Sequence, residues 1–335
     1  MMTAKQSAAV RPDPTTHRKS AIVHGGVADR AGQVSITPIK DFDLDRTIFQ
    51  TLEGAAARYV MRTRVAKEVS WKPDSAREIQ DRYAVARDQH PLPGVKPELL
   101  RFLVEECDFD VEHADGSFLD HLYFGFEYTV QHYPQHSPLV MLLHSILGTG
   151  TNTFAMTAEK IPPLKEMLSP FEWNHIEAFP SVLRLLYDGG LRQELRANIH
   201  RPDALRQIHF HRVIDNTPIT MSGEDLWIQL NYQLIHLIDF LPVANWRTHQ
   251  NDTAFIVFRD LYALMQEAGA LEATLAYNPA SGPRKLLNEE TSFTGWLTTL
   301  IPVGISEQMA AKSVRRFSDR IGHDLAYQID WLDQG

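Results

Sequence analysis

Two histidines, His121 and His144, are the first candidates for chemistry, because each interrupts a largely apolar stretch with helical spacing. A single histidine on an apolar helix face is most often a core residue. Two of them on consecutive short helices, the second followed by the turn Gly148–Thr151, favour a shared site. Neutral imidazoles bind iron, manganese or zinc, and they exchange protons near neutral pH. We therefore expect His121 and His144 to act as metal ligands or as acid–base residues.

Three hydroxyl groups accompany these histidines. Ser145 follows His144 directly, Thr149 lies in the glycine-rich turn, and Tyr128 lies two helical turns after His121. We expect Ser145 to act beside the two histidines in the catalytic centre. Thr149 and Tyr128 are expected to hydrogen-bond substrate or a bound water.

The helix that should begin after Ser222 carries a polar stripe on an otherwise apolar sequence. The stripe positions step by three or four residues, so they share one side of the helix. Such a stripe either faces solvent or lines a polar pocket, and both interpretations remain open. If it lines a pocket, Gln233 and Tyr232 bind substrate and His236 is a third metal ligand, with His113 or His175 as further candidates. The stripe comprises Gln229, Tyr232, Gln233, His236 and Asp239.

Helical periodicity dominates the rest of the chain. Ser169 to Glu172 forms a capping box, and Pro180 should kink or end the helix that this box begins. The segment 213–219 favours a short β-hairpin, and a last helix is expected over roughly 306–332. These patterns predict an all-α fold with one small hairpin. Residues 1–40 should form a flexible tail before a single helical domain, 41–335, which ends in extra helices over 250–335.

Composition excludes several functional classes. The net charge of −9 argues against a broad nucleic-acid or anionic-membrane surface, although it leaves a local basic patch open. The one cysteine, Cys107, cannot form an intramolecular disulfide, which fits a reducing compartment. No apolar run approaches the roughly 20 residues of a membrane span, and the start of the chain lacks the features of a secretory signal. A cytoplasmic protein is therefore expected. Phosphate-binding loop, nucleophile-elbow, HExxH and cysteine-rich zinc motifs are all lacking.

The two histidine stretches resemble the paired motifs of an uncharacterised family within the HD-domain-like superfamily. The resemblance implies a helical bundle whose core covers about residues 95–245. Ser145 stands where HD sites have an aspartate that bridges metal ions. HD sites also have an aspartate on a later helix, and this aspartate has no clear counterpart here. The residues nearest to its place are Gln233, His236 and Asp239. The motifs are Leu119-Asp120-His121-Leu122 and His144-Ser145-Ile146-Leu147-Gly148-Thr149.

The same resemblance implies an enzyme that acts on a small molecule with the help of a metal. HD-like proteins include hydrolases of phosphorylated compounds and iron-dependent oxygenases, and the residues do not choose between these reactions. The alternative is an HD-like domain without catalysis, serving as a ligand-binding or protein-interaction module. In either case we expect a small-molecule ligand and neither a nucleic-acid nor a membrane partner. The basic last helix could pack on the body of the protein or on a second subunit.

Overall fold

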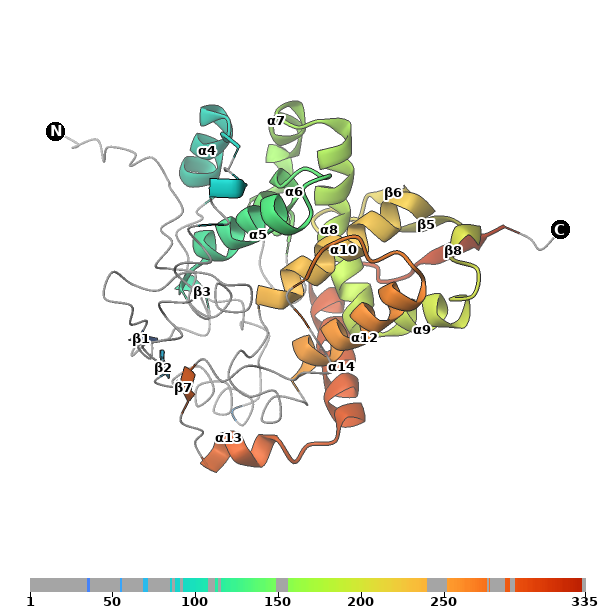
Figure 1. The fold of residues 1–335 in the computed structure, drawn as a ribbon. Helices are drawn as coiled ribbons and strands as arrows, with labels where there is room; N and C mark the ends of the chain where they lie inside the picture. Colours follow the sequence, from blue (N-terminus) through green and yellow to red (C-terminus); the bar gives the residue numbers. More distant parts are fainter. Residues whose placement is uncertain are drawn as a thin grey trace.

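The described part of the chain is mainly helical. A computed structural model (Figure 1) describes residues 35–36, 55, 69–71, 85, 88–90, 93–107, 112–113, 116–148, 156–239, 252–275, 277, 287–289 and 293–332. The expected tail, residues 1–40, lies outside this set except for β1 (Ser35–Ile36). β1 pairs antiparallel with β2 (Val69–Trp71), and β2 pairs with β7 (Leu287–Glu289).

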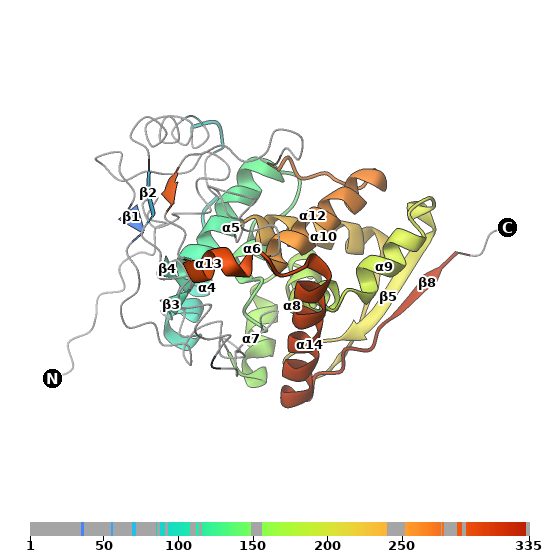
Figure 2. The same cartoon turned by 90° about the horizontal axis from the view of Figure 1, so that it is seen from below.

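Two long helices, α8 (Pro170–Asp188) and α10 (Gly223–Asp239), lie at the centre of the described fold. α5 (Phe118–His132) and α6 (Leu139–Leu143) pack on one side of α10, while α12 (Thr253–Glu267) packs on the other. α14 (Val303–Ile321) runs along α8, as Figure 2 shows from below. Shorter helical elements complete this part: α4 (Pro97–Arg101) with a π-helical turn (Phe102–Glu106), α7 (Ile161–Glu166), α9 (Gly190–Ala197) and α13 (Phe293–Thr298).

α8 begins at the expected capping box, in which the Ser169 hydroxyl accepts from the backbone N–H of Glu172 and the Glu172 carboxylate accepts from that of Ser169. Pro180 was expected to end or kink this helix. It does not end the helix, because α8 continues to Asp188. Proline costs the helix one backbone hydrogen bond. Buried neighbours such as Phe179 and Val182 pack this segment into the core and offset that loss. Gly189, at φ 90°, ends α8 and begins α9.

A three-stranded antiparallel sheet has the order β6-β5-β8. β5 (Leu205–His211) and β6 (Pro218–Ser222) form a hairpin, as expected, but the expected bounds, 213–219, are wrong: they cover only part of the turn and the start of β6, and the first strand ends at His211. From Ile208 to His211 the side chains of β5 alternate in burial. The expected last helix is wrong beyond Ile321. Gly322, at φ 73°, ends α14, and β8 (Gln328–Trp331) pairs with β5. The fold is therefore helical with a small sheet, larger than the single hairpin expected.

α6 is shorter than the sequence indicates. It ends at Leu143, and residues 144–147 form a turn in which Ile146 N donates to Leu143 O and Gly148 N donates to Ser145 O. His144 and Ser145 thus lie in a tight turn just after the helix. None of the described helices is long and apolar enough to cross a membrane.

Candidate functional site

The polar stripe of α10 faces the interior. Gln229, Tyr232 and Gln233 are fully buried, and His236 is 7% exposed. The solvent-facing alternative is therefore wrong for these four residues; the side chain of Asp239 lies outside the described residues. The stripe packs against α8 and α6, and it forms a polar seam through an apolar core.

One end of the seam brings together two of the three histidines proposed from the sequence. The rings of His144 and His236 lie with centroids 4.7 Å apart at an interplanar angle of 66°. Phe179 of α8 contacts both rings, at centroid distances of 4.8 Å and 5.4 Å. The backbone of His121 lies in α5, but its side chain is outside the described residues, as is Thr149. The shared site therefore has two described members.

The orientation of His144 follows from a hydrogen bond within its own turn. Its Nδ1 lies 2.7 Å from the carbonyl oxygen of Met141. A carbonyl only accepts hydrogen bonds, so Nδ1 carries the proton and the neutral ring has its lone pair on Nε2. This is the arrangement in which metal-binding histidines are commonly held. His144 is 1% exposed, so the ring is also shielded from bulk water.

Gly125 allows α5 and α6 to approach closely enough to build this turn. A Cβ atom at Gly125 would lie 2.8 Å from Met141 Cε and 3.2 Å from Met141 Cβ. Real Cβ contacts are rarely this short, so a larger residue would push Met141 and the His144 turn away from α5. The glycine is therefore part of the support of the site.

The other end of the seam contains His175 of α8, which is fully buried. Its Nδ1 lies 2.9 Å from Gln229 Oε1, and its Nε2 lies 3.5 Å from Asp225 Oδ1. The contact with His175 and a hydrogen bond from Ser222 hold the pKa of Asp225 below its usual range, against the opposing effect of burial. Asp225 is not among the site residues predicted from the sequence. Extending the stripe by one helical turn upstream of Gln229 would have found it.

The remaining predicted residues have defined positions. Ser145 is 3% exposed beside His144. Gln233 Nε2 donates to the Phe179 carbonyl at 3.0 Å, in the middle of the seam. The Tyr232 hydroxyl donates to Ser137 O at 2.8 Å, so it ties α10 to the start of α6. Tyr128 is buried and stacks on His132 at 4.1 Å, and burial lowers the pKa of His132 to about 4.

The turn between β5 and β6, residues 212–217, is held by ion pairs of Arg212. Arg212 contacts both carboxylate oxygens of Asp215, at 2.8 Å and 2.7 Å, and also Glu177 of α8 at 2.8 Å. Burial raises the pKa of Glu177 although Arg212 opposes the shift, while Arg212 lowers the pKa of Asp215. These charges satisfy one another, which assigns them to holding the hairpin turn on α8.

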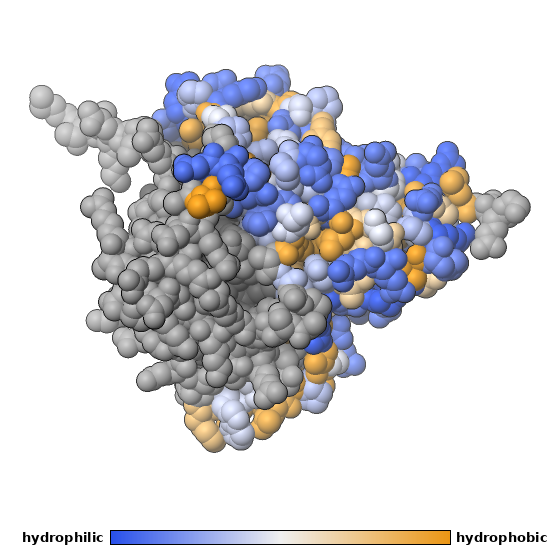
Figure 3. Space-filling model, in the orientation of Figure 1, coloured by the Kyte–Doolittle hydropathy of each residue, from blue (hydrophilic) through white to orange (hydrophobic). Residues whose placement is uncertain are grey.

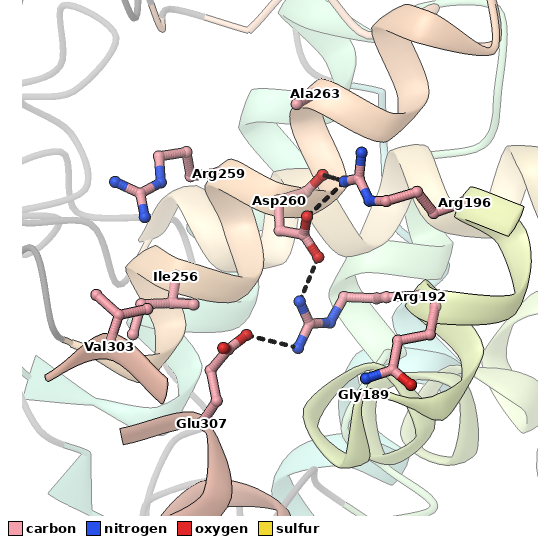
Figure 4. A pocket seen from close by; sticks show the side chains of 10 residues that line it. Gly189, Arg192, Arg196, Ile256, Arg259, Asp260, Ala263, Val303 and Glu307 are labelled. Carbon is pink, nitrogen blue, oxygen red and sulfur yellow. Dashed lines mark hydrogen bonds and ion pairs between the residues drawn. The ribbon is translucent and has the colours of Figure 1, made fainter. Parts of the chain in front are cut away.

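A cavity of about 480 Å³ lies between α9, α12 and the start of α14. Figure 4 shows the side chains that line it. Its most buried charged residue, Arg192, contacts Asp260 and also donates to Glu307 at 3.2 Å. Arg196 contacts the other oxygen of Asp260. The charges in the cavity are thus largely paired with each other, and they join three helices. No local pattern of residues predicts this network, because its members are far apart along the chain.

Within the described residues, no group of three or more histidine, cysteine or carboxylate side chains is arranged to hold a metal ion. The His144–His236 pair offers two candidate donors, and the side chains of His121 and His113 lie outside the described residues. His175 lies at the Asp225 end of the seam rather than beside His236. Comparisons with models of known protein families, with curated proteins and with solved structures find no match to this chain.

Proposed function

We propose that this chain is an HD-like enzyme that acts on a small molecule at the His144–His236 pair. The observation that carries the proposal is the approach of the His144 and His236 rings to 4.7 Å between centroids. The 2.7 Å contact between His144 Nδ1 and Met141 O assigns the ring proton to Nδ1, which is the tautomer in which histidines commonly bind metals through Nε2. The ring of His236 lies beside it, and Phe179 limits the access of water. A buried polar pair of this kind, with a small number of placed polar groups around it, suits a small-molecule site.

The neighbouring residues have roles that follow from their positions. His144 and His236 would bind the metal or transfer protons, and His121 is the proposed third member from α5. Ser145 and Thr149 would hydrogen-bond substrate or water in the turn after α6. Gln233 holds the α10 side against the Phe179 carbonyl, which fixes the distance between α8 and α10 at the site.

Iron, manganese or zinc would suit the imidazole donors. Such an ion supplies Lewis acidity toward a bound water or a phosphoryl oxygen and, if it is iron, reactivity toward oxygen. The histidine donors, the carbonyl that orients His144 and the dry surroundings fit such an ion. Hydrolysis of a phosphorylated compound and oxygenation are both compatible with these donors.

Elemental analysis of the purified protein tests this proposal. We expect a first-row metal at close to one equivalent per chain, and we expect its loss in His144→Gln and in His236→Gln with the fold intact by circular dichroism. His200→Gln is the matched control, because His200 is exposed after α9. Equal metal content in all four proteins, or no metal in the wild type, would contradict a metal enzyme at this pair.

A second candidate is a catalytically inactive HD-like module that binds a ligand or another protein. The observation that favours it is the burial of His144, His236 and His175, whose rings pack against Phe179, Phe171 and Tyr232 as core residues do. If the seam is structural, His144→Gln and His236→Gln should unfold the protein at much lower urea concentrations, and the wild type should bind no metal.

A further inference from the structure

Apolar side chains gather at one end of the molecule, over α13 and the start of α14. We call this region the α13–α14 tip. Phe293 is 73% exposed and Leu300 is 61% exposed, which is unusual for side chains of their size. Figure 3 shows apolar atoms at the lower end of the molecule, where Figure 1 places α13 and the start of α14. The exposed set comprises Phe293, Trp296, Leu297, Leu300, Ile305 and Met309.

The apolar tip continues into a basic stripe along one face of α14. Ile305, Met309, Lys312 and Arg316 follow at steps of four, three and four residues, so they lie on the same helix face. Lys312 and Arg316 are exposed. At a rise of about 1.5 Å per residue, Arg316 lies roughly 10 Å along the axis from Met309.

Two other charges of α14 contact the body of the protein: Arg315 donates to Asp188 of α8 at 2.5 Å, and Glu307 accepts from Arg192 at 3.2 Å. The exposed Asp319 and Arg320 follow at the end of the helix, and together with Lys312 and Arg316 they leave this face net positive. The buried side of the helix carries Val314, Phe317 and Ser318 against α8. The outward face of α14 therefore presents apolar groups first and cations second.

We propose that the α13–α14 tip docks on an anionic lipid surface. Aromatic and aliphatic side chains partition about 5–10 Å into the boundary between headgroups and acyl chains, and nearby Lys and Arg bind anionic headgroups. The roughly 10 Å offset between the apolar residues and Arg316 matches that depth. This surface departs from the expectation, drawn from the net charge of −9, that the chain has no membrane partner; it is the local basic patch that the net charge leaves open. The docking is peripheral and confined to one face, because the charge of the rest of the chain would repel the same membrane.

Charge complementarity favours an anionic lipid surface over a second copy of the chain as the partner of the α13–α14 tip. Two copies paired through the tip would bring Lys312 and Arg316 of each toward the same stripe of the other, and like charges at an interface are unfavourable. The tip also projects at the end of the molecule, whereas a partner helix docks in a groove. A fluid anionic surface satisfies both the apolar and the basic parts.

Vesicle co-sedimentation with the full chain tests the proposal. We expect binding to phosphatidylcholine vesicles that contain phosphatidylserine, weaker binding to pure phosphatidylcholine, and a decrease with added salt. Leu300→Asp should reduce binding at least tenfold, and Leu332→Asp, which changes an equally apolar exposed residue at the other end of the protein, should not. Lys312→Gln with Arg316→Gln should reduce binding roughly tenfold or more. The charge-matched pair Arg206→Gln with Arg315→Gln should have little effect.

Trp296 supplies a direct readout. The chain has six tryptophans, so the difference between wild type and Trp296→Phe isolates its emission. A blue shift of this difference spectrum on addition of anionic vesicles supports insertion. Equal binding of wild type and Leu300→Asp overturns the proposal, as does no binding to either vesicle. A concentration-dependent dimer that Leu300→Asp abolishes would identify a second copy as the occupant instead.

Discussion

The ring of His175 on α8 faces the carboxylate of Asp225 on α10, with Nε2 and Oδ1 3.5 Å apart inside the core. This contact joins the two central helices at the end of the seam opposite His144. Ser222 Oγ caps α10 by accepting from the backbone N–H of Asp225 at 3.0 Å, and it donates to the Asp225 carboxylate at 2.8 Å. The same carboxylate therefore supports the cap and approaches a buried histidine. The start of α10 and the packing of α8 are therefore linked through one side chain.

Asp225→Asn should lower the free energy of unfolding by about 1–3 kcal/mol at pH 7, because it weakens both the cap and the contact with the buried ring. The pKa of Asp225 is lower in the folded protein than in the unfolded chain, so the ionised carboxylate stabilises the fold. This stabilisation is present above the unfolded-state pKa of 3.8 and is lost as the pH falls below that value. Urea denaturation at pH 7 and pH 3 measures it. Glu224→Gln, an exposed acid in the same helical turn, is the control and should change stability by less than about 0.5 kcal/mol.

Stability should also fall in mildly acidic solution because of His323. Burial lowers its pKa from 6.5 to about 4, with Nε2 near the His211 carbonyl at 3.0 Å and Arg184 and Ser318 beside Nδ1. The unfolded state then takes up the proton first, so stability is full above pH 6.5 and decreases down to about pH 4.

The loss expected from His323 is on the order of 2–3 kcal/mol. Thermal melts across this range should show a smaller slope for His323→Gln than for the wild type. An unchanged slope would assign the acid sensitivity to other groups, such as His132.

Asp260 should be one of the most important charged residues for stability. Asp260→Asn removes the carboxylate that contacts both Arg192 and Arg196 and leaves the Arg192 guanidinium buried with Glu307 alone. Breaking such a network costs about 2–4 kcal/mol. Glu267→Gln removes a more exposed partner of Arg196, 3.8 Å away, and should cost less than about 0.5 kcal/mol. Equal urea midpoints for the two variants would show that the network contributes little.

Gly223 should tolerate no side chain. A Cβ there would lie 1.9 Å from the Leu205 carbonyl oxygen, so Gly223→Ala must separate the start of α10 from β5. We expect a loss of several kcal/mol, seen as a large decrease in melting temperature. Gly304→Ala, in α14, meets nothing within 4 Å and should stabilise the protein by about 0.5–1 kcal/mol. Similar melting temperatures for the two variants would contradict the close contact.

The sequence predicts those elements that are determined by residues close together along the chain. The cap at Ser169 and the α10 stripe each depend on residues within a few turns, and the structure has both. β8 was mistaken for helix because four residues carry little periodicity, and its partner β5 supplies the strand pairing. The helix passes Pro180 because tertiary packing outweighs one lost hydrogen bond.

In the candidate site, too, features set by local spacing were predictable and features set by tertiary packing were not. Spacing predicts that His236 belongs to the polar stripe of α10, and the structure brings its ring beside that of His144. The Met141 carbonyl contact could not be predicted, since it depends on α6 ending at Leu143. Asp225 and the Arg192 network needed knowledge of which helices touch. HD-like chemistry at His144 stays a prediction until metal content is measured.

The position of β8 in the sheet has a consequence for how the chain is made. His209 of β5 and Asp330 of β8 are neighbours in space but 121 residues apart in sequence. At synthesis rates of about 5–20 residues per second, β5 would wait roughly 6–24 s with one backbone edge open after it leaves the ribosome. An open strand edge is a template for pairing with other chains. Newly made protein should therefore be most prone to aggregation, and most dependent on chaperones, during the interval before its last strand arrives.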